Sequence, residues 1–531
     1  MPFFNLGGLF PIKKGIKGPP FIFLKSTNLV KIKAEKEGNM FTKKSVINQT
    51  ILPVIEKISL ENPDPTVIYK KIALNNQYSF ILENLSINEK KYSLIGITPL
   101  KVVKLNYLAK NKTKLNFFEK GKTFFDESTD YISFLKEQLE SIQYESILNI
   151  PDLFASFVGY FGYDIISIWE DIYHNEMDKD LKHGDLPLSI LVFPRISLIL
   201  DQSEKVGYLV NVVDSGSEED IESRISLAKH ENHKILKDLE KTSTQKEEER
   251  NNDQVKLKIK HHTSKEEFIE KVEKTKNYIN AGEAFQIVLS QRFSCKITQH
   301  PFEIYENLRK INPSPYMFYL NFPEATIIGS SPEMLVKVEG QRVITRPLAG
   351  TRKRGETPKA DEAIEKELLS DEKERAEHIM LVDLARNDLG RVCKEGSVKV
   401  TKFFGIEKYS HVMHIYSQVE GLKKDYLNSL DVLKSLFPAG TVSGAPKIRA
   451  IEIIDELEDE PREIYAGVVG YIDTKGNLDT SIAIRTMVCK ENEVRIQAGA
   501  GIVSYSIGEN EYYETVNKAM AMFKSLEKGD C

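Results

Sequence analysis

"SKEEFIEKVEKTKNYINAGEAFQIVLSQRF" (264–293) places a helical pattern directly before a strand-like run. Ser264, followed three positions later by Glu267, is a capping-box pattern that starts a helix. Phe268 and Val272 then continue an apolar stripe at helical spacing. After the turn residues Asn-Ala-Gly-Glu, the run "FQIVLSQRF" is rich in β-branched and aromatic residues and predicts a strand.

The rest of the chain continues this mixture of helical and strand-like segments. Segments rich in β-branched and aromatic residues predict strands at 78–85, 91–105 and 157–166. Helical spacing marks 358–390, where a helix is expected to break or end near Asn387 and Gly390, and 512–528. Because no regular β–α–β alternation joins these segments, they favour an α+β fold.

Length and composition narrow the class of protein. A chain of 531 residues is too long for one ordinary core, so we expect one large or two packed domains. Net charge is −5, from 73 basic and 78 acidic residues, which argues against nucleic acid or an anionic membrane as the main partner. The four cysteines form no CxxC pair, which favours a reducing, cytoplasmic compartment without a thiolate metal site.

The sequence divides into four stretches. Residues 1–45 are expected to be a disordered or mis-assigned N-terminal extension, because the lysine-rich start precedes the first well-patterned segment. Residues 50–235 and 262–525 have the patterning of ordered regions. Between them, 236–260 is dense in charge and predicts a linker or exposed loop.

Two pairs of glutamates share one spacing. Glu374 and Glu377 lie three apart in "DEKERAEH", and Glu511 and Glu514 lie three apart in "ENEYYET". On a helix each pair occupies one face, where a solvated acidic surface is the alternative to a binding role. Two such pairs can supply hard oxygen ligands that suit Mg²⁺ better than zinc.

Other motifs offer groups for proton transfer and for anion binding. His414 in "HVMHI" (411–415) is a candidate for proton transfer, with a structural histidine as the alternative. The loop "PAGTVSGAPK" (438–447) fails the P-loop pattern, because Ala-Pro separates its last glycine from Lys447. The backbone N–H groups of this loop can still bind a carboxylate. Arg485 is a second candidate for binding a carboxylate, with an ordinary outward-facing strand residue as the alternative.

The stretch "RPLAGTRKRG" (346–355) holds four cations around Ala349, a methyl group at the centre of a segment suited to anions. Together with the glutamate pairs, it suggests a metal-dependent site for a small molecule with several carboxylates. The residues alone do not name a reaction.

Residues from about 50 to 523 resemble the large component of anthranilate synthase, within the chorismate-utilising enzyme family. The resemblance implies an α+β fold of two large packed antiparallel β-sheets with outer helices and an active site in a cleft. It is carried, in this order, by "SFILENL", "KYSLIG", "GYFGYD", "AFQIVLSQRF", "NPSPYMFYL", "SSPEMLVK", "RPLAGTRKRG", "DEKERAEHIMLVDLARNDLGRV", "HVMHIYSQVEG", "FPAGTVSGAPK", "YAGVVGY", "TSIAIRT", "QAGAGIV" and "EYYETVNKA".

The resemblance also implies roles for individual residues. Glu333 falls where the family protonates the departing C4 hydroxyl of chorismate, and His414 where it eliminates pyruvate. The implied Mg²⁺ ligands are Glu374, Glu377, Glu511 and Glu514. The implied substrate contacts are Gly350, Thr351, Thr441, Tyr465, Arg485, Gly501 and Lys518, with Lys447 as a further candidate.

Two positions bear on the choice of reaction within the family. Relatives that make aminodeoxychorismate typically carry a nucleophilic lysine where this chain has Ala349. Relatives that add water, the isochorismate and salicylate enzymes, carry a lysine base where this chain has Gln286. The resemblance therefore implies anthranilate and pyruvate as products, with ammonia delivered by a separate glutamine amidotransferase subunit, in the first committed step of tryptophan biosynthesis. A non-catalytic regulatory subunit is the alternative from a different class.

A feedback site for L-tryptophan is implied at Asn84, Pro315, Tyr316 and Met317. Asn84 departs from the family, which has serine there. Asparagine still forms hydrogen bonds, although it is bulkier.

Overall fold

The computed structural model describes residues 49–87, 90–109, 112–119, 121–127, 130–147, 150–172, 180–215, 220–241, 257–409 and 412–527. The expected N-terminal extension (1–45) and His411 lie outside these ranges. Within the described residues, no helix is both long enough and apolar enough to cross a membrane.

The linker expected at 236–260 is shorter than predicted. Helix α4 (Ile221–Glu240) continues through its first five positions, because Ile235, Leu236 and Leu239 pack against a buried cluster. Strand β10 (Lys260–His261) ends the segment, whose middle, 242–256, is outside the described residues.

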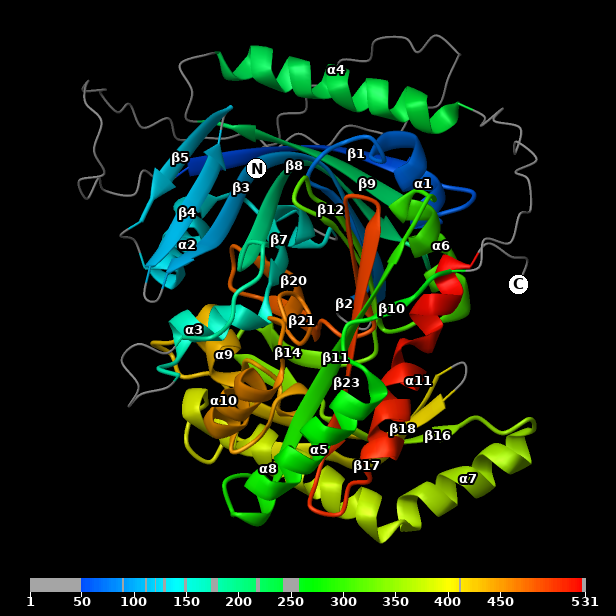
Figure 1. Cartoon of the computed structure of the whole chain (residues 1–531). Helices are drawn as coiled ribbons and strands as arrows, with labels where there is room; N and C mark the ends of the chain where they lie inside the picture. The colour runs from blue at the N-terminus through cyan, green and yellow to red at the C-terminus, as the bar shows by residue number, and fades with distance from the viewer. Residues whose placement is uncertain are drawn as a thin grey trace, which may run out of the picture.

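Two large antiparallel sheets form the body of the protein and are continuous with each other (Figure 1). The first runs β1–β9–β8–β3–β2–β12–β13–β22–β23–β11–β10. Its strands are β1 (Gln49–Ser59), β9 (Val206–Asp214), β8 (Ser189–Asp201), β3 (Lys90–Ala109), β2 (Ser79–Ile87), β12 (Tyr316–Asn321), β13 (Thr326–Ser331), β22 (Thr486–Lys490), β23 (Glu493–Ile502) and β11 (Gln286–Lys296), with β10.

The second sheet runs β5–β4–β3–β8–β7–β20–β21–β14–β15–β18–β17, and β16 also pairs with β18. Its further strands are β5 (Lys122–Asp126), β4 (Lys112–Glu119), β7 (Ser156–Phe161), β20 (Val468–Asp473), β21 (Leu478–Ile482), β14 (Met334–Glu339), β15 (Arg342–Thr345), β18 (Val412–Leu422), β17 (Lys399–Lys408) and β16 (Leu348–Lys353). Short strands β6 (Ile142–Gln143) and β19 (Gly444–Ala445) pair with β1 and β11.

The long strands β3 and β8 belong to both sheets. The first half of β3 pairs with β2 and its second half with β4, while β8 follows β3 along its length. Register shifts interrupt the β3–β8 ladder between Gly96 and Lys101, where Pro99 stands opposite Pro194. Irregularities of this kind bend a strand, so the chain passes from one sheet to the other here. The predicted α+β fold of two packed antiparallel sheets is confirmed.

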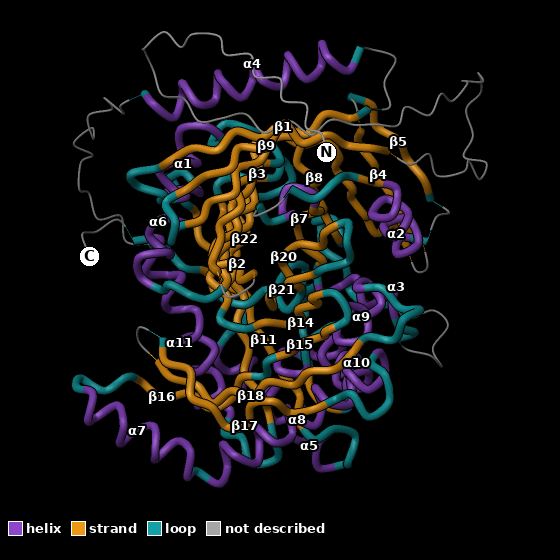
Figure 2. Tube along the Cα trace, turned by 180° about the vertical axis from the view of Figure 1, so that it is seen from behind, coloured by secondary structure: helices purple, strands orange, loops and turns teal. Residues whose placement is uncertain are grey.

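Alternation along the strands explains the two hydrophobic layers. In β2, Phe80 and Leu82 belong to the inner cluster between the sheets, whereas Ile81 belongs to the outer cluster. Helices cover that outer face, with Tyr69 and Phe302 buried in it. The covering helices are α1 (Pro65–Ile72), α6 (Pro301–Ile311) and α11 (Gly508–Leu526), as Figure 2 shows from behind.

The helical stretch predicted at 358–390 is two helices, α7 (Pro358–Ser370) and α8 (Glu372–Val392). The break lies at Asp371, whose side chain accepts hydrogen bonds from the backbone N–H groups of Lys373 and Glu374 and so starts α8. At the other end, α8 passes through Asn387 and Gly390 and ends at Val392, close to the end predicted near Gly390. The remaining helices are α2 (Tyr131–Ser141), α3 (Ile166–Trp169), α5 (Lys265–Asn280), α9 (Ser429–Leu436) and α10 (Lys447–Leu457).

The two ordered sequence regions are interleaved in space. Strand β2, from the first region, pairs with β12 from the second, and β7 likewise pairs with β20. Residues far apart in the sequence therefore share both sheets and can meet in one site.

Candidate active site

Strands β16 and β18 place three residues of "RPLAGTRKRG" beside His414. Thr351 stands opposite His414, and Ala349 stands opposite Ile415. The register shifts between these pairs at Gly350, which has a positive φ of 61°. A left-handed conformation at this bulge favours glycine, and it lets Ala349 and Thr351 flank the histidine.

His414 is held as a neutral base. Its Nδ1 lies 3.2 Å from the Gly350 carbonyl oxygen and 3.0 Å from Thr351 Oγ1. Because the carbonyl can only accept, Nδ1 carries the proton. The buried Nε2, which has no hydrogen-bond partner among the described residues, keeps its lone pair. Burial, with the nearby positive charges of Arg485 and Lys518, lowers the pKa of His414 to about 4.

The pKa of Glu333 is shifted in the opposite direction from that of His414. Glu333 lies between β13 and β14 and is 7% exposed. Burial raises the pKa of Glu333 to about 7, although the Thr441 side chain, the Leu348 backbone and the charges of Lys518 and Arg485 counteract part of this effect. A carboxyl group with this pKa is available in its protonated form near neutral pH.

Arg485, Lys518 and Thr441 lie near these two groups. Arg485 has a positive φ of 48°, an uncommon conformation for arginine, and its burial lowers the pKa of the guanidinium. Lys518, on α11, donates to the Gly499 carbonyl at 3.0 Å. Thr441 borders a hollow together with Glu333, and its side chain lies close enough to the Glu333 carboxyl group to lower the pKa of that group.

Strands β11 and β23 contribute a second wall. A Cβ atom on Gly501 would lie 2.4 Å from Gln286 Nε2, so glycine there makes room for the amide of Gln286. A Cβ atom on Gly499 would lie 2.6 Å from Tyr465 Oη. These close approaches place the Gln286 side chain and the buried Tyr465 ring against the backbone of β23.

The segment that precedes Tyr465 is fixed by buried charges. Arg462 pairs with Glu458 at 2.6 Å and donates to the Val442 and Val288 carbonyls at 2.6 and 2.7 Å. Its guanidinium carbon also lies 5.5 Å from the centroid of the Tyr465 ring. Arg462 therefore links the loop around Thr441, strand β11 and the Tyr465 ring.

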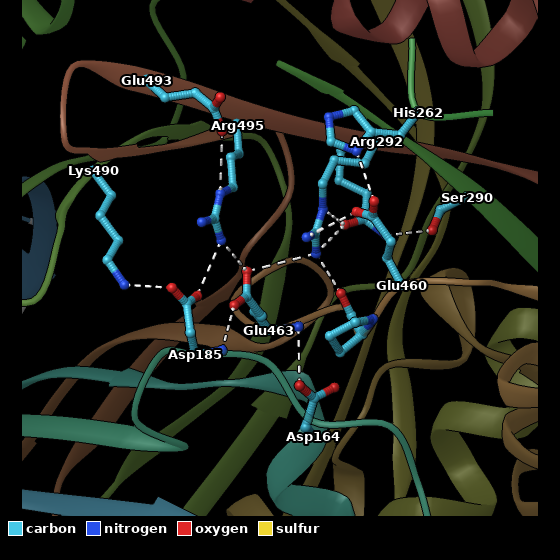
Figure 3. A network of polar contacts seen from close by, with 12 residues as sticks. Asp164, Asp185, His262, Ser290, Arg292, Glu460, Glu463, Lys490, Glu493 and Arg495 are labelled. Atoms are coloured by element: carbon cyan, nitrogen blue, oxygen red, sulfur yellow. Dashed lines mark hydrogen bonds and ion pairs between the residues drawn. The ribbon is translucent and has the colours of Figure 1, made fainter. Parts of the chain in front are cut away.

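Beyond this cation, a wider network joins the two sequence regions (Figure 3). Arg292 lies 3.6 Å from Glu463, and Glu463 lies 3.2 Å from Arg495. The backbone N–H of Glu463 donates to Asp164 at 3.1 Å, and Arg495 also pairs with Asp185 at 3.2 Å. Asp164 and Asp185 belong to the N-terminal region, so this network anchors it to the strands behind Tyr465.

The two glutamate pairs face each other across α8 and α11. Burial, together with the negative charges of Glu374 and Glu514, raises the pKa of Glu377. Burial and the charge of Glu514 likewise raise the pKa of Glu511, against a hydrogen bond from Ser506. The structure therefore brings the predicted metal ligands close enough to repel one another.

Nearby cations share this acidic cluster. Arg352 lies 2.9 Å from Glu374, and Lys518 lies 2.8 Å from Glu514. Among the residues that the structure describes, no three acidic, histidine or cysteine side chains are arranged as a ready-made metal site. The donor set nevertheless fits Mg²⁺, because repulsion between carboxylates is what a hard divalent cation relieves.

Lys447, the further candidate for a substrate contact, is bound to protein groups. Its Nζ pairs with Asp388 at 3.1 Å and donates to the Leu436 carbonyl at 3.0 Å. Residue patterns also missed Tyr409, whose ring centroid lies 5.6 Å from that of His414. Nothing in its local sequence signals this position.

Three of the four residues predicted for tryptophan feedback line a separate hollow of about 900 Å³. Asn84 has a positive φ of 63°, which asparagine tolerates well, and its Nδ2 donates to the Ser314 carbonyl at 3.0 Å. Pro315 and Tyr316 line the same hollow. Met317 does not, because its side chain is buried in the outer cluster of the first sheet.

Comparison with known proteins agrees with this geometry. A profile described as "chorismate binding enzyme" matches residues 85–524. The chain belongs to the chorismate-binding enzyme family. Among its relatives in the family, "Anthranilate synthase component 1" of Aquifex aeolicus is 43% identical over 488 residues, covering 90% of this chain and 95% of the relative. That of Acetivibrio thermocellus is 43% identical over 482 residues, covering 90% and 96%.

Solved structures of the family share the fold. Anthranilate synthase component I from Streptococcus pneumoniae TIGR4 superposes with a TM-score of 0.69 at 35% identity, covering 88% of this chain and 98% of that one. MenF, the menaquinone-specific isochorismate synthase of Escherichia coli, superposes with a TM-score of 0.65 at 18% identity, covering 91% and 96%. This chorismate-binding enzyme therefore has the architecture of its family along almost its whole described length.

Proposed function

We propose that this protein converts chorismate and ammonia into anthranilate and pyruvate, as the large, aminating component of an anthranilate synthase. One observation carries the proposal. A buried acid with a pKa of about 7 and a buried neutral histidine lie beside one strand, β16, which carries an alanine at position 349. The relatives with the same printed name span nearly the whole chain, which supports the same reaction.

Substrate binding falls to groups that converge on Glu333 and His414. Arg485 and Lys518 supply positive charge for carboxylates of chorismate. The Thr441 hydroxyl, which borders the same hollow as Glu333, supplies a hydrogen-bonding group for a substrate oxygen. The walls of the proposed substrate site are formed by Gly350, Thr351, Tyr465 and Gly501.

Two proton transfers follow from the shifted pKa values. The C4 hydroxyl of chorismate is a poor leaving group, so Glu333 donates a proton to its oxygen while ammonia attacks C2. Pyruvate is then eliminated and the ring becomes aromatic, which requires loss of the proton at C2. Nε2 of His414 accepts that proton, because Nδ1 is already bonded to the Gly350 carbonyl.

Ala349 and Gln286 select this reaction over its close alternatives. Alanine provides no amine nucleophile next to His414, and glutamine is not a base at neutral pH. Ammonia can therefore reach C2 without a competing protein group. We assign its delivery to a separate glutamine amidotransferase subunit.

Mg²⁺ would be held by Glu374, Glu377, Glu511 and Glu514, and it would offset the negative charge of the ring carboxylate. L-Tryptophan would inhibit by binding in the hollow lined by Asn84, Pro315 and Tyr316. The three cysteines that the structure describes are buried and unpaired, which supports a reducing compartment such as the cytoplasm.

A product assay tests the proposal. The purified chain is mixed with chorismate, Mg²⁺ and a high concentration of an ammonium salt, and anthranilate fluorescence is followed together with pyruvate. We expect both products in equal amounts, and none after addition of EDTA. An aminated product that retains the enolpyruvyl group, or isochorismate, would overturn the proposal in favour of the aminodeoxychorismate or isochorismate/salicylate reaction. Chorismate binding without turnover would favour a non-catalytic subunit.

A further inference from the structure

Arg352 joins three acidic side chains around the N-terminal end of α8. Its Nε and Nη2 both contact Glu367 of α7 at 3.1 Å. Nη2 also contacts Asp371 at 3.0 Å, and Nη1 contacts Glu374 at 2.9 Å. The planar guanidinium thus ties β16, the strand beside His414, to α7 and to the first turn of α8.

The contact with Glu374 fixes how that carboxylate points. Oε1 accepts from Arg352, whereas Oε2 lies 3.1 Å from the position that a Cβ atom on Gly350 would occupy. Gly350 is the bulge residue whose carbonyl contacts His414. One oxygen of Glu374 is therefore occupied by Arg352, and the other faces the strand that borders the site.

We propose that Arg352 is a positioning residue of the metal site, which holds Glu374 so that Oε2 is available to the divalent cation. This rests on the proposed function, in which Glu374 is a Mg²⁺ ligand. Hydrogen-bond partners of metal-binding carboxylates commonly set ligand orientation, and their loss typically weakens metal binding. Lysine cannot replace the arginine, because one ammonium group cannot reach Glu367, Asp371 and Glu374 together in this geometry.

If Arg352 competed with the cation instead of positioning Glu374, the expected change in metal affinity would have the opposite sign. If Arg352 only competed with the cation for Glu374, its removal would leave a more negative site and metal binding would become tighter. If Arg352 positions Glu374, its removal weakens metal binding even though a positive charge has been lost. The sign of the change therefore separates the two roles without any measurement of catalysis.

The experiment measures binding of Mn²⁺, as a spectroscopic substitute for Mg²⁺, by electron paramagnetic resonance of the free ion. We compare the wild-type chain with Arg352→Gln and Arg352→Lys. The matched control is Arg375→Gln, on α8 beside Glu374, because Arg375 contacts the Leu369 carbonyl and the Phe404 ring instead of a predicted ligand. We expect about 10- to 100-fold weaker binding in both Arg352 variants and no change in the control.

A second variant checks that the effect passes through Glu374. In a Glu374→Gln background, Arg352→Gln should weaken Mn²⁺ binding no further, since the carboxylate it positions is gone. Unchanged or tighter binding in Arg352→Gln, or equal losses in both backgrounds, would overturn the inference while leaving the proposed reaction intact. No Mn²⁺ binding by the wild-type chain would overturn the metal assignment and the inference together. Circular dichroism of each variant confirms that it is folded.

Discussion

The candidate active site and the hollow lined by Asn84, Pro315 and Tyr316, where we propose that tryptophan binds, lie close together but differ in how their polar groups are paired. In the active site, Nε2 of His414 is buried without a partner among the described residues, and burial raises the pKa of Glu333 but lowers that of His414. In the hollow, charged side chains mostly satisfy one another. Lys337 pairs with Glu339 at 2.8 Å, and Arg346 pairs with Glu407 at 3.3 Å, although Nε of Arg346 has no partner among the described residues.

This difference indicates separate tasks for the two places. Groups without partners are costly to bury, so they persist where a ligand or a reaction uses them. Paired charges give a hollow its shape and leave little reactivity. The first is therefore suited to chemistry and the second to recognition, and each prediction below tests one side of that contrast.

The largest effect is expected from removing the acid. Glu333→Gln keeps the shape of the side chain but cannot release a proton, so kcat should fall about 10²- to 10⁴-fold. The measurement is anthranilate formation with saturating chorismate and ammonium. Glu339→Gln, a glutamate of the hollow, is the control and should keep near-wild-type kcat. Similar losses of kcat in both variants would contradict the difference between the active site and the hollow.

A smaller effect is expected from filling the space beside Gln286. Gly501→Ala would put a Cβ atom 2.4 Å from Gln286 Nε2, so that side chain must move into the site. Misplacement on this scale typically costs about 10- to 100-fold in kcat/KM. Chorismate saturation curves measure it, and Gly390→Ala, where a Cβ atom has open space, is the control. An unaltered kcat/KM in Gly501→Ala would show that Gly501 and Gln286 do not belong to the site.

The pH dependence should show both shifted groups. Glu333 acts in its protonated form, so kcat/KM should fall about tenfold per pH unit above its pKa of about 7. His414 acts in its neutral form, so kcat/KM should fall only as the pH drops through about 4. Rates are measured per concentration of NH₃, because ammonium also titrates. A profile that stays flat through pH 9 would contradict the role of Glu333.

Much of this fold could be predicted from the sequence, but side-chain partnerships could not. Segments rich in β-branched and aromatic residues predicted β2 and β3, and Ser264 with Glu267 predicted the start of α5, because such patterns act between near neighbours. The break at Asp371 was missed, since one capping aspartate competes with a continuous helical pattern.

In the site, sequence motifs named residues without their geometry. His414 was predicted as a proton-transfer group, but its fixed Nδ1 bond to Gly350 depends on strand register, which no local pattern reveals. The direction of Lys447 toward Asp388 and the place of Met317 in the outer cluster likewise depend on tertiary packing.

The smallest expected effect concerns coupling between the hollow and the active site. Asn84 donates to the Ser314 carbonyl, and Ser314 Oγ lies 3.0 Å from Ser330 Oγ. The backbone N–H of Ser330 donates to the Arg485 carbonyl at 3.1 Å. The wall of the hollow is thus connected to Arg485, a residue that we propose to bind substrate, through the buried Ser330.

Ser330→Ala should weaken this communication while leaving both sites in place. We expect the concentration of tryptophan that halves activity to rise about two- to thirtyfold, as typical coupling energies of about 0.5–2 kcal/mol allow. Tryptophan affinity without chorismate, measured by calorimetry, should stay the same. Ser79→Ala is the control, because Ser79 is equally buried but bonds to Tyr69 and the Asn76 carbonyl. If affinity and inhibition weakened in parallel, Ser330 would belong to the hollow alone, and the coupling would have to follow another path.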